Sequence, residues 1–208
     1  MLDRLRARLH RVRPHTAHVD GVRLWIPPGV LDPNLFRSGA WFARHVARRI
    51  QPGHSLLDLG CGSGVVGVLA QRAGAKVTAA DLNPSAAEAA RRNGVADVRH
   101  GDLFEPLRGE RFDRIAFNPP YFPGTPSDRG FDRALYGGPQ LEVFARFLAG
   151  VDRHLADGGR AWVVLSDRAP DAIRLVEAAG WRAVVAEVMC GERLSVWRRA
   201  AMGYPGSD

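Results

Sequence analysis

From residue 55 to the end of the chain, short apolar runs alternate with longer segments whose apolar residues recur at helical spacing. Strict alternation of strands and helices is typical of a parallel sheet covered by helices on both faces, so we predict an α/β fold. The last two apolar runs are joined by residues 189–193 alone, which leaves no room for a crossover helix. These two strands are therefore predicted to pair as an antiparallel hairpin.

The same pattern defines the expected elements. The predicted strands span residues 55–59, 76–80, 97–99, 112–117, 160–165, 181–188 and 194–197, and the predicted helices span residues 64–73, 84–93, 139–155 and 170–179. Residues 121–138 carry several prolines and glycines but no helical or strand period. They are predicted to form a long irregular loop, which is usually functional; a disordered surface insertion is the alternative.

The chain has 208 residues, which suits one domain. We expect residues 1–54 to form a helical or extended segment that packs on a core domain of residues 55–200. A hydrophobic content of 46% argues against disorder, and no apolar stretch approaches the roughly 18 residues that span a bilayer, which predicts a soluble protein. Cys61 and Cys190 make neither a disulfide framework nor a metal-ligand pattern, so we expect a cytoplasmic protein without a metal site.

Positive charge is concentrated at the N-terminus. The formal net charge is +7, and Lys76 is the only lysine, a bias that a GC-rich genome explains. Near the N-terminus, apolar residues at helical spacing are interleaved with arginines, which predicts a basic amphipathic helix (Leu2, Leu5, Leu9 and Val12; Arg4, Arg6, Arg8, Arg11 and Arg13). We expect this helix to pack on the domain with its arginines in solvent. The alternatives are a contact for an acidic partner or nucleic acid, and a transit peptide.

A glycine-rich turn, Asp58-Leu-Gly-Cys-Gly-Ser-Gly64, joins the first strong strand to the first strong helix. Glycines let the backbone turn sharply and approach a ligand closely. The turn overlaps the dinucleotide pattern G-x-G-x-x-G, and Asp81 follows Gly62 by 19 residues, as a ribose-binding acid would, so a nicotinamide-dependent oxidoreductase is one interpretation. Against it, Asp58 would repel a pyrophosphate and attract an ammonium group, and no helix-capping role is expected for Asp58.

A second motif, Asn118-Pro-Pro-Tyr121, follows the fourth strand at the ligand-binding edge of such a sheet. The lone pair of a planar NH₂ group is delocalised, and a site can help by accepting both of its hydrogens. We expect the Asn118 side-chain oxygen to accept one hydrogen and the Pro119 carbonyl the other, while Tyr121 stacks on the acceptor. The prolines stiffen the chain and add no competing N–H donors. A simple turn would not require the second proline or the aromatic residue.

Together these residues resemble the class I S-adenosylmethionine-dependent methyltransferases. The resemblance implies a Rossmann-like, seven-stranded, mostly parallel sheet of order 3-2-1-4-5-7-6, with S-adenosyl-L-methionine as cofactor and S-adenosyl-L-homocysteine as product. It also implies cofactor contacts from the glycine loop, from an acid at the ribose, from a pair at the adenine and from the second motif (Asp58, Gly60, Gly62 and Gly64; Asp81 and Leu82; Asp102 and Leu103; Asn118).

Simpler interpretations exist for three of these positions. Asp81 could cap the helix that begins at residue 84, and Asp102 could cap a turn. Cys61 could suggest a nucleophile, but no charged residue stands next to it in the sequence, so we expect a small buried filler.

The Asn-Pro-Pro-Tyr motif is typical of methyltransferases that act on planar NH₂ groups. Residues 133–143 and 191–197 resemble the HemK/PrmC family, in particular its short HemK2/MTQ2-like branch. This resemblance makes residues 55–200 the methyltransferase domain. It implies a protein glutamine amide in a translation termination factor as the acceptor. Enzymes of the short branch often need a small activating subunit paired with a sheet edge, so the resemblance also implies such a subunit as a partner.

One departure from that branch leaves the acceptor open. Pro33 is followed by Asn34 and Leu35, where the branch tends to show an acidic pair. A small-molecule or natural-product amine is therefore an alternative acceptor, and so is an RNA or DNA base. The candidate catalytic residues are Asn118, Pro119 and Tyr121, and the candidate acceptor-binding residues are Pro120, Asp128, Arg129 and Arg133. The three charged loop residues are equally compatible with solvated surface charges.

Overall fold

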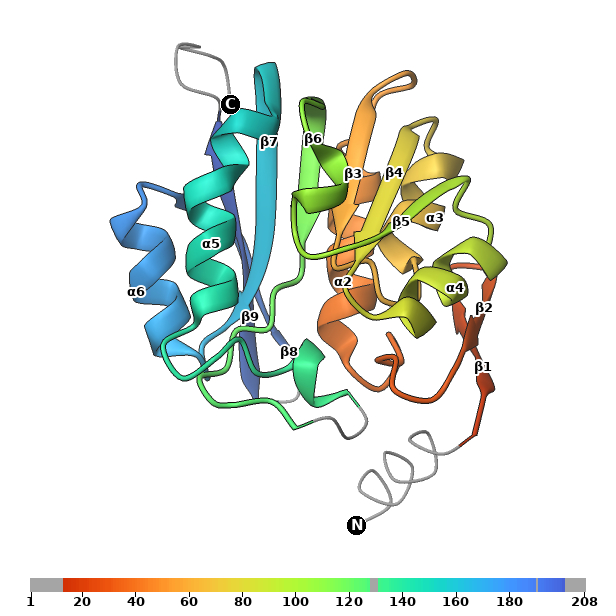
Figure 1. Ribbon diagram of the computed structural model, residues 1–208, viewed down its shortest axis with the longest axis horizontal. Coiled ribbons are helices and arrows are strands. Elements are labelled where there is room, and N and C mark those ends of the chain that lie inside the picture. The colour runs from red at the N-terminus through yellow and green to blue at the C-terminus, as the bar shows by residue number, and fades with distance from the viewer. Residues whose placement is uncertain (1–12, 128–130, 190, 201–208) are drawn as a thin grey trace.

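A computed structural model describes residues 13–127, 131–189 and 191–200 (Figure 1). The strands are β1 His15–Val19, β2 Val22–Ile26, β3 Ser55–Leu59, β4 Lys76–Asp81, β5 Asp97–His100, β6 Phe112–Phe117, β7 Leu155–Ser166, β8 Arg182–Met189 and β9 Glu192–Ala200. The α-helices are α2 Arg37–Ala47, α3 Val65–Arg72, α4 Pro84–Arg92, α5 Glu142–Gly150 and α6 Pro170–Ala178. Three short 3₁₀ helices are η1 Glu105–Leu107, η2 Asp132–Ala134 and η3 Val151–His154.

Seven strands form one sheet in the order β5-β4-β3-β6-β7-β9-β8. The first five of these are parallel to one another, whereas β9 pairs antiparallel with both β7 and β8. Counted along the chain from β3, this order is 3-2-1-4-5-7-6. The predicted sheet order and the predicted C-terminal hairpin are therefore confirmed.

Helices cover both faces of the sheet, because the central strands carry apolar residues on both sides. On one face, α2, α3 and α4 pack in a core cluster that includes Leu56 and Ala116. On the other face, α5 and α6 pack in a second cluster that includes Leu57 and Ile115 (Figure 1). Consecutive strand residues thus point to opposite layers, as the period of a strand requires.

The segment before the sheet contributes to the first of these cores. β1 and β2 pair as an antiparallel hairpin, and its inward side chains Val19 and Leu24 belong to the cluster that contains Leu56. α2 adds Phe42, which is fully buried. The basic helix predicted near the N-terminus lies outside the described residues. Within the described ranges, no helix has the length and apolar character needed to cross a membrane.

Two sequence-based expectations were wrong in detail. The helix predicted over residues 139–155 ends as α5 at Gly150, and one turn of 3₁₀ helix follows. Leu155 instead begins β7, because it pairs with Phe112 across an irregular start of the β6–β7 ladder. The loop after β6 also contains more order than predicted, since η2 lies within it and two isolated bridges join residues 122 and 136 and residues 124 and 138.

Candidate active site

The glycine loop between β3 and α3 turns sharply at three glycines. Gly60, Gly62 and Gly64 have φ values of 61°, 54° and 76°, a region that other residues rarely adopt. Close packing adds a second constraint at Gly64, where a Cβ atom would lie 3.0 Å from the Cα of Ala90 in α4. The loop therefore brings its backbone to the edge of a cavity of about 450 Å³ at the carboxyl ends of the strands.

Asp58 lies beneath this loop with only 3% of its surface exposed. Its Oδ2 accepts a hydrogen bond of 2.9 Å from the backbone N–H of Gly67 in the first turn of α3. The expectation that Asp58 has no capping role was wrong, because this contact caps the helix from the preceding strand. Burial raises the pKa of Asp58 to about 8, the Gly67 hydrogen bond opposes that rise, and the nearby charge of Asp81 adds to it.

Asp81 is the last residue of β4, and its carboxylate accepts hydrogen bonds from the glycine loop and from the segment that leads into α4. Its Oδ2 accepts from the N–H of Gly62 and its Oδ1 from the N–H of Asn83, both at 2.8 Å. Asn83, not Asp81, is the cap of α4, since the Asn83 side chain accepts from the N–H of Ser85. Burial raises the pKa of the Asp81 carboxyl, although both backbone hydrogen bonds lower it.

Asp102 lines the cavity after β5 and is paired with a residue from another element. Arg146 of α5 donates to both carboxylate oxygens, at 2.9 Å and 3.0 Å. The backbone of Asp102 also accepts from the N–H of Glu105 in a turn, and the adjacent Leu103 has a positive φ of 47°. Asp102 thus takes part in a turn, while its side chain is held by Arg146 at the cavity wall.

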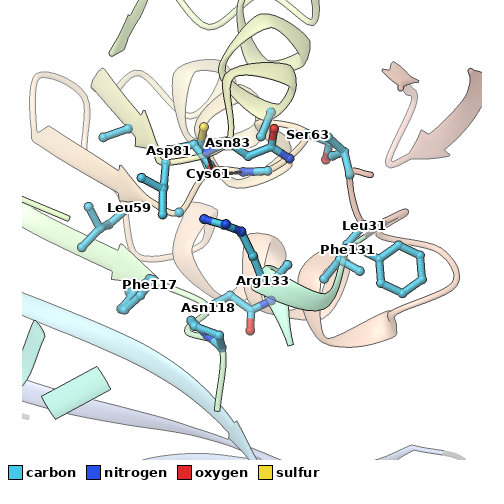
Figure 2. A pocket seen from close by; sticks show the side chains of 18 of the residues that line it. Leu31, Leu59, Cys61, Ser63, Asp81, Asn83, Phe117, Asn118, Phe131 and Arg133 are labelled. Atoms are coloured by element: carbon cyan, nitrogen blue, oxygen red, sulfur yellow. Dashed lines mark hydrogen bonds between the residues drawn. The ribbon is translucent and has the colours of Figure 1, made fainter. Parts of the chain in front are cut away.

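The Asn-Pro-Pro-Tyr motif begins where β6 ends. Asn118 and Pro120 line the cavity. Asn118 lies across the cavity from Asp81 and Cys61 (Figure 2). The Pro120 carbonyl is closely approached by Gly137, where a Cβ atom would lie 2.3 Å from that oxygen. Only a glycine fits at this position without moving the motif.

The loop after the motif folds back over the cavity. Phe131 is buried and meets Phe36, the residue before α2, edge to face with ring centroids 5.3 Å apart. Two residues on, the Arg133 side chain extends from η2 into the cavity (Figure 2). The loop and the N-terminal segment therefore meet and form one wall of the site.

Comparison with known proteins identifies the family. Residues 37–188 match the family model described as the methyltransferase small domain. The chain belongs to this methyltransferase family. The match confirms the predicted class of enzyme, an S-adenosylmethionine-dependent methyltransferase, and it covers β3 to β8 together with α2.

Individual relatives point to the HemK/PrmC branch. The chain is 33% identical over 162 residues to a release factor glutamine methyltransferase of Xylella fastidiosa, which covers 68% of this chain and 58% of that protein. It is 36% identical over 115 residues to a ribosomal protein L11 methyltransferase of Thermosipho africanus, covering 51% of this chain and 44% of the relative. The matches thus cover 58% of the first of these relatives and 44% of the second.

The fold is shared with solved methyltransferases. A T. thermophilus 16S rRNA N2 G1207 methyltransferase, solved with AdoMet and guanosine, superposes with a TM-score of 0.66 at 22% sequence identity. The superposition covers 91% of this chain and 50% of the other. At this identity the likeness concerns the fold, and it agrees with the Rossmann-like sheet predicted for this methyltransferase.

Several predicted site residues of the methyltransferase lie together, and others do not. The cavity is lined by ten of them: Asp58, Gly60, Gly62, Asp81, Leu82, Asp102, Leu103, Asn118, Pro120 and Arg133. Gly64, Pro119 and Tyr121 are not among the lining residues. The Tyr121 ring packs at 4.9 Å from Phe122, and burial raises the pKa of its hydroxyl to about 12. Asp128 and Arg129 lie outside the described residues.

Cys61 behaves as the sequence suggested. The residue is only 5% exposed, and burial, with the charges of Asp81 and Asp58 adding to it, raises the pKa of its thiol well above the ordinary value. A thiol that keeps its proton is a poor nucleophile. Cys61 therefore serves the methyltransferase as a cavity-lining apolar residue.

Sequence reasoning missed the part of this methyltransferase site that comes from distant segments. Phe36, Phe131 and Arg146 all line the cavity, but none belongs to a recognisable motif. Gly137 was missed as well, although its pairing with Gly138 in a long loop was a visible signal. A Gly-Gly dipeptide usually marks a turn or loop, and glycine is the residue that lets two backbone segments approach closely.

Proposed function

We propose that this chain transfers the methyl group of S-adenosyl-L-methionine to a planar NH₂ group, and that the acceptor is a glutamine side-chain amide in a protein of the translation release factor type. The observation that carries the proposal is the position of Asn118, which follows β6 and lines the same cavity as the glycine loop and Asp81. Cofactor and acceptor nitrogen would meet in that cavity. The release factor glutamine methyltransferase relative supports this choice of acceptor.

The residues around the cavity fit the cofactor. Asp58 and Asp81 supply carboxyl groups toward a ligand that carries a sulfonium and an ammonium group. Each Asp81 oxygen has a second lone pair after its backbone hydrogen bond, so the carboxylate can also accept from the ribose hydroxyls. Asp102 and Leu103, on the next strand end, would hold the adenine.

The second motif supplies the chemistry at the nitrogen. S-adenosylmethionine would supply the electrophilic methyl carbon: the acceptor nitrogen would bond to it while the carbon–sulfur bond breaks, and the electron pair would stay with sulfur in S-adenosyl-L-homocysteine. Asn118 and the Pro119 carbonyl would accept the two N–H hydrogens and orient the nitrogen lone pair along the line of attack. No general base is required, because the methylated nitrogen is strongly acidic and loses its proton to water.

A direct assay separates the acceptor classes. We expect labelled S-adenosylmethionine to label a purified release factor from the same source, with the added methyl mapped to one glutamine by mass spectrometry. A release factor with that glutamine replaced by asparagine is the matched control and should take up no label. Label that enters RNA, DNA or a small amine, but not the release factor, would refute the proposed acceptor while keeping the enzyme class.

Asn118→Ala tests the proposed catalytic contact. We expect turnover to fall by about 10²-fold or more, because the nitrogen loses an oriented acceptor, whereas cofactor affinity stays largely intact. Turnover in the saturating range and calorimetric binding of S-adenosylhomocysteine measure the two effects separately. Unchanged turnover would remove Asn118 from the mechanism.

An activating subunit belongs to the same proposal. The sheet has two edge strands, β5 and β8, and either offers backbone groups for an added strand. If activity depends on such a subunit, the isolated chain binds cofactor but turns over slowly, and co-expression with the partner restores turnover.

A further inference from the structure

Acidic side chains outnumber basic ones around the cavity. Among the described residues that line it, the acids are Asp32, Asp58, Asp81 and Asp102, and the cationic side chains are Arg133 and Arg146. S-adenosyl-L-methionine carries one carboxylate beside its sulfonium and ammonium groups. The acids suit the two cationic groups but repel the carboxylate, so this group needs a cation or N–H donors beside it when it leaves water.

Several backbone donors of the glycine loop are already used within the protein. The N–H of Cys61 donates to the carbonyl of Ala80, and the N–H of Gly64 donates to the carbonyl of Cys61. The N–H of Gly62 donates to the Asp81 carboxylate. These hydrogen bonds leave fewer N–H groups of the loop for a ligand, which favours a side chain as the partner of the carboxylate.

The two cationic side chains lie at different places on the cavity wall. Arg146 of α5 donates to both carboxylate oxygens of Asp102, which follows β5 at one edge of the sheet. Arg133 belongs to η2, in the loop after β6, and its side chain extends into the cavity toward Asp81 and Cys61 (Figure 2). Since β4 and β3 separate β5 from β6, Arg133 is the cationic side chain nearer to the glycine loop and the Asn-Pro-Pro-Tyr motif.

Packing fixes the backbone from which the Arg133 side chain extends. Phe131, two residues earlier, is 5% exposed and meets the ring of Phe36 edge to face. The carbonyl of Asp132 accepts a hydrogen bond of 2.9 Å from the N–H of Tyr136. These contacts hold η2 against the N-terminal segment, so the guanidinium group is presented to the cavity by an ordered backbone.

The chemistry of the ligands indicates which group this guanidinium binds. The proposed acceptor is a neutral amide, whereas the cofactor brings a carboxylate, and the fork of guanidinium N–H donors fits both oxygens of a carboxylate. If the methyl group is transferred beside Asn118, the methionine chain begins at the sulfur there, on the side of the cavity where Arg133 lies. We propose that Arg133 binds the methionine carboxylate of S-adenosyl-L-methionine, rather than the acceptor.

This assignment rests on the proposed function only for the position of the sulfonium near Asn118, and not on the identity of the acceptor. It makes Arg133 the residue that distinguishes the cofactor from nucleosides that lack an amino-acid carboxylate.

Calorimetry with two ligands tests the assignment on the full chain, without an acceptor. S-adenosyl-L-homocysteine has the carboxylate, and S-adenosyl-3-thiopropylamine is the same molecule with hydrogen in its place. We expect the unmodified chain to bind the first ligand about tenfold or more tightly than the second. Arg133→Met should weaken binding of S-adenosyl-L-homocysteine by about tenfold or more and leave binding of the analogue nearly unchanged, because a charge-assisted hydrogen bond is lost for the first ligand alone.

Two control variants separate this effect from a general disturbance of the site. Arg133→Lys keeps the charge but not the fork of donors, so part of the preference for the carboxylate should remain. Arg146→Met removes the other cationic side chain of the cavity wall and should keep the ratio of the two affinities. Both ligands carry the ammonium group, so a change of protonation at Asp58 cancels in that ratio.

Three results would overturn the proposal. Equal losses for both ligands, in Arg133→Met and Arg133→Lys alike, would show that Arg133 supports the cavity without binding the carboxylate. A preference for the carboxylate that survives in Arg133→Met would assign that group to backbone donors. Unchanged affinities for both ligands together with a higher KM for the acceptor would place Arg133 on the acceptor side. Each of these results leaves the identity of the acceptor to its own assay.

Discussion

Asp58 is a carboxyl group that the fold holds mainly in its protonated form near neutral pH. Its side chain is buried under the glycine loop, and burial raises its pKa from 3.8 to about 8. In the unfolded chain the Asp58 carboxyl has the ordinary pKa of 3.8, so between pH 3.8 and about pH 8 the folded state binds more protons than the unfolded state. Stability of the ligand-free protein is therefore expected to fall as pH rises from about 4 through 8.

A cationic ligand in the cavity reverses this preference. We expect binding of S-adenosylmethionine to release protons near pH 7, and its affinity to increase up to about pH 8, because the ligand favours the ionised carboxyl. Calorimetry in two buffers of different ionisation enthalpy measures the proton release. Asp58→Asn, which keeps the shape and the acceptor oxygen for Gly67, should flatten both pH profiles. Proton release that persists in this variant would assign it to another group.

At the scale of elements, the loop after β6 packs against the Asn-Pro-Pro-Tyr motif. The backbone N–H of Phe122 donates to the carbonyl of Leu135, and the N–H of Gly137 donates to the carbonyl of Phe122, so the two ends of this loop are joined. Gly137 packs against the Pro120 carbonyl, and Val143 at the start of α5 donates to the Gly137 carbonyl. The position of the two prolines is thus coupled to the start of α5.

Gly137→Ala should disturb this coupling. A Cβ atom would lie 2.3 Å from the Pro120 oxygen, so the backbone of the motif must shift. We expect turnover to fall by about tenfold or more while the protein stays folded, since misplacement by about 1 Å costs about 10²-fold in rate. Gly109→Ala is the control: its φ of 77° strains an alanine, but its Cβ meets nothing within 4 Å. The control should lose about 1 kcal/mol of stability and no turnover.

α5 acts on the cofactor side of the cavity through Arg146. This side chain donates to both carboxylate oxygens of Asp102, the residue that we propose holds the adenine. Arg146→Met should raise the KM for S-adenosylmethionine by a few-fold, up to about tenfold, with a smaller effect on kcat, because the pair is partly exposed. Arg174→Met in α6 removes an arginine paired with Asp171 and should leave both constants unchanged. Equal effects from the two variants would argue against a specific role for Arg146.

At the scale of the whole molecule, the N-terminal segment belongs to the site as well as to the core. His15 of β1 bonds Asp32 at 2.9 Å, and Asp32 lines the cavity together with Phe36. The backbone carbonyl of Asp32 accepts from the N–H groups of Leu35 and Phe36. The turn that leads into α2 is therefore held by a residue some distance earlier in the chain.

Two truncations separate these contributions. Removal of residues 1–14 should spare cofactor binding, because the His15–Asp32 bond is retained. Removal of residues 1–20 also takes away Ala17 and Val19, each at most 2% exposed, and should cost several kcal/mol of stability and weaken cofactor binding. Thermal melting and calorimetry measure both effects. If removal of residues 1–14 abolishes activity while stability and cofactor binding are kept, these residues contact the acceptor or a partner.

Much of the fold follows from signals that act over a few residues. The alternation of apolar runs predicts β3 to β9 and their order of appearance, because each strand and helix has its own period. The sequence-based assignment was wrong where contacts between distant residues fix the local structure. Leu155 is one case: it was expected to end a helix, but its pairing with Phe112 makes it the first residue of β7. The bridges within residues 121–138 were missed for the same reason.

By itself, the sequence determined the sheet, the glycine loop and the acids that follow the strands, since strand ends of a parallel sheet meet at one edge whatever the packing around them. Only the tertiary structure decided which distant side chains complete that edge. Arg146 reaches Asp102 across 44 positions, and Phe131 meets the ring of Phe36 from a distant loop. Such contacts leave no local pattern, because the packing of helices and loops alone brings them together.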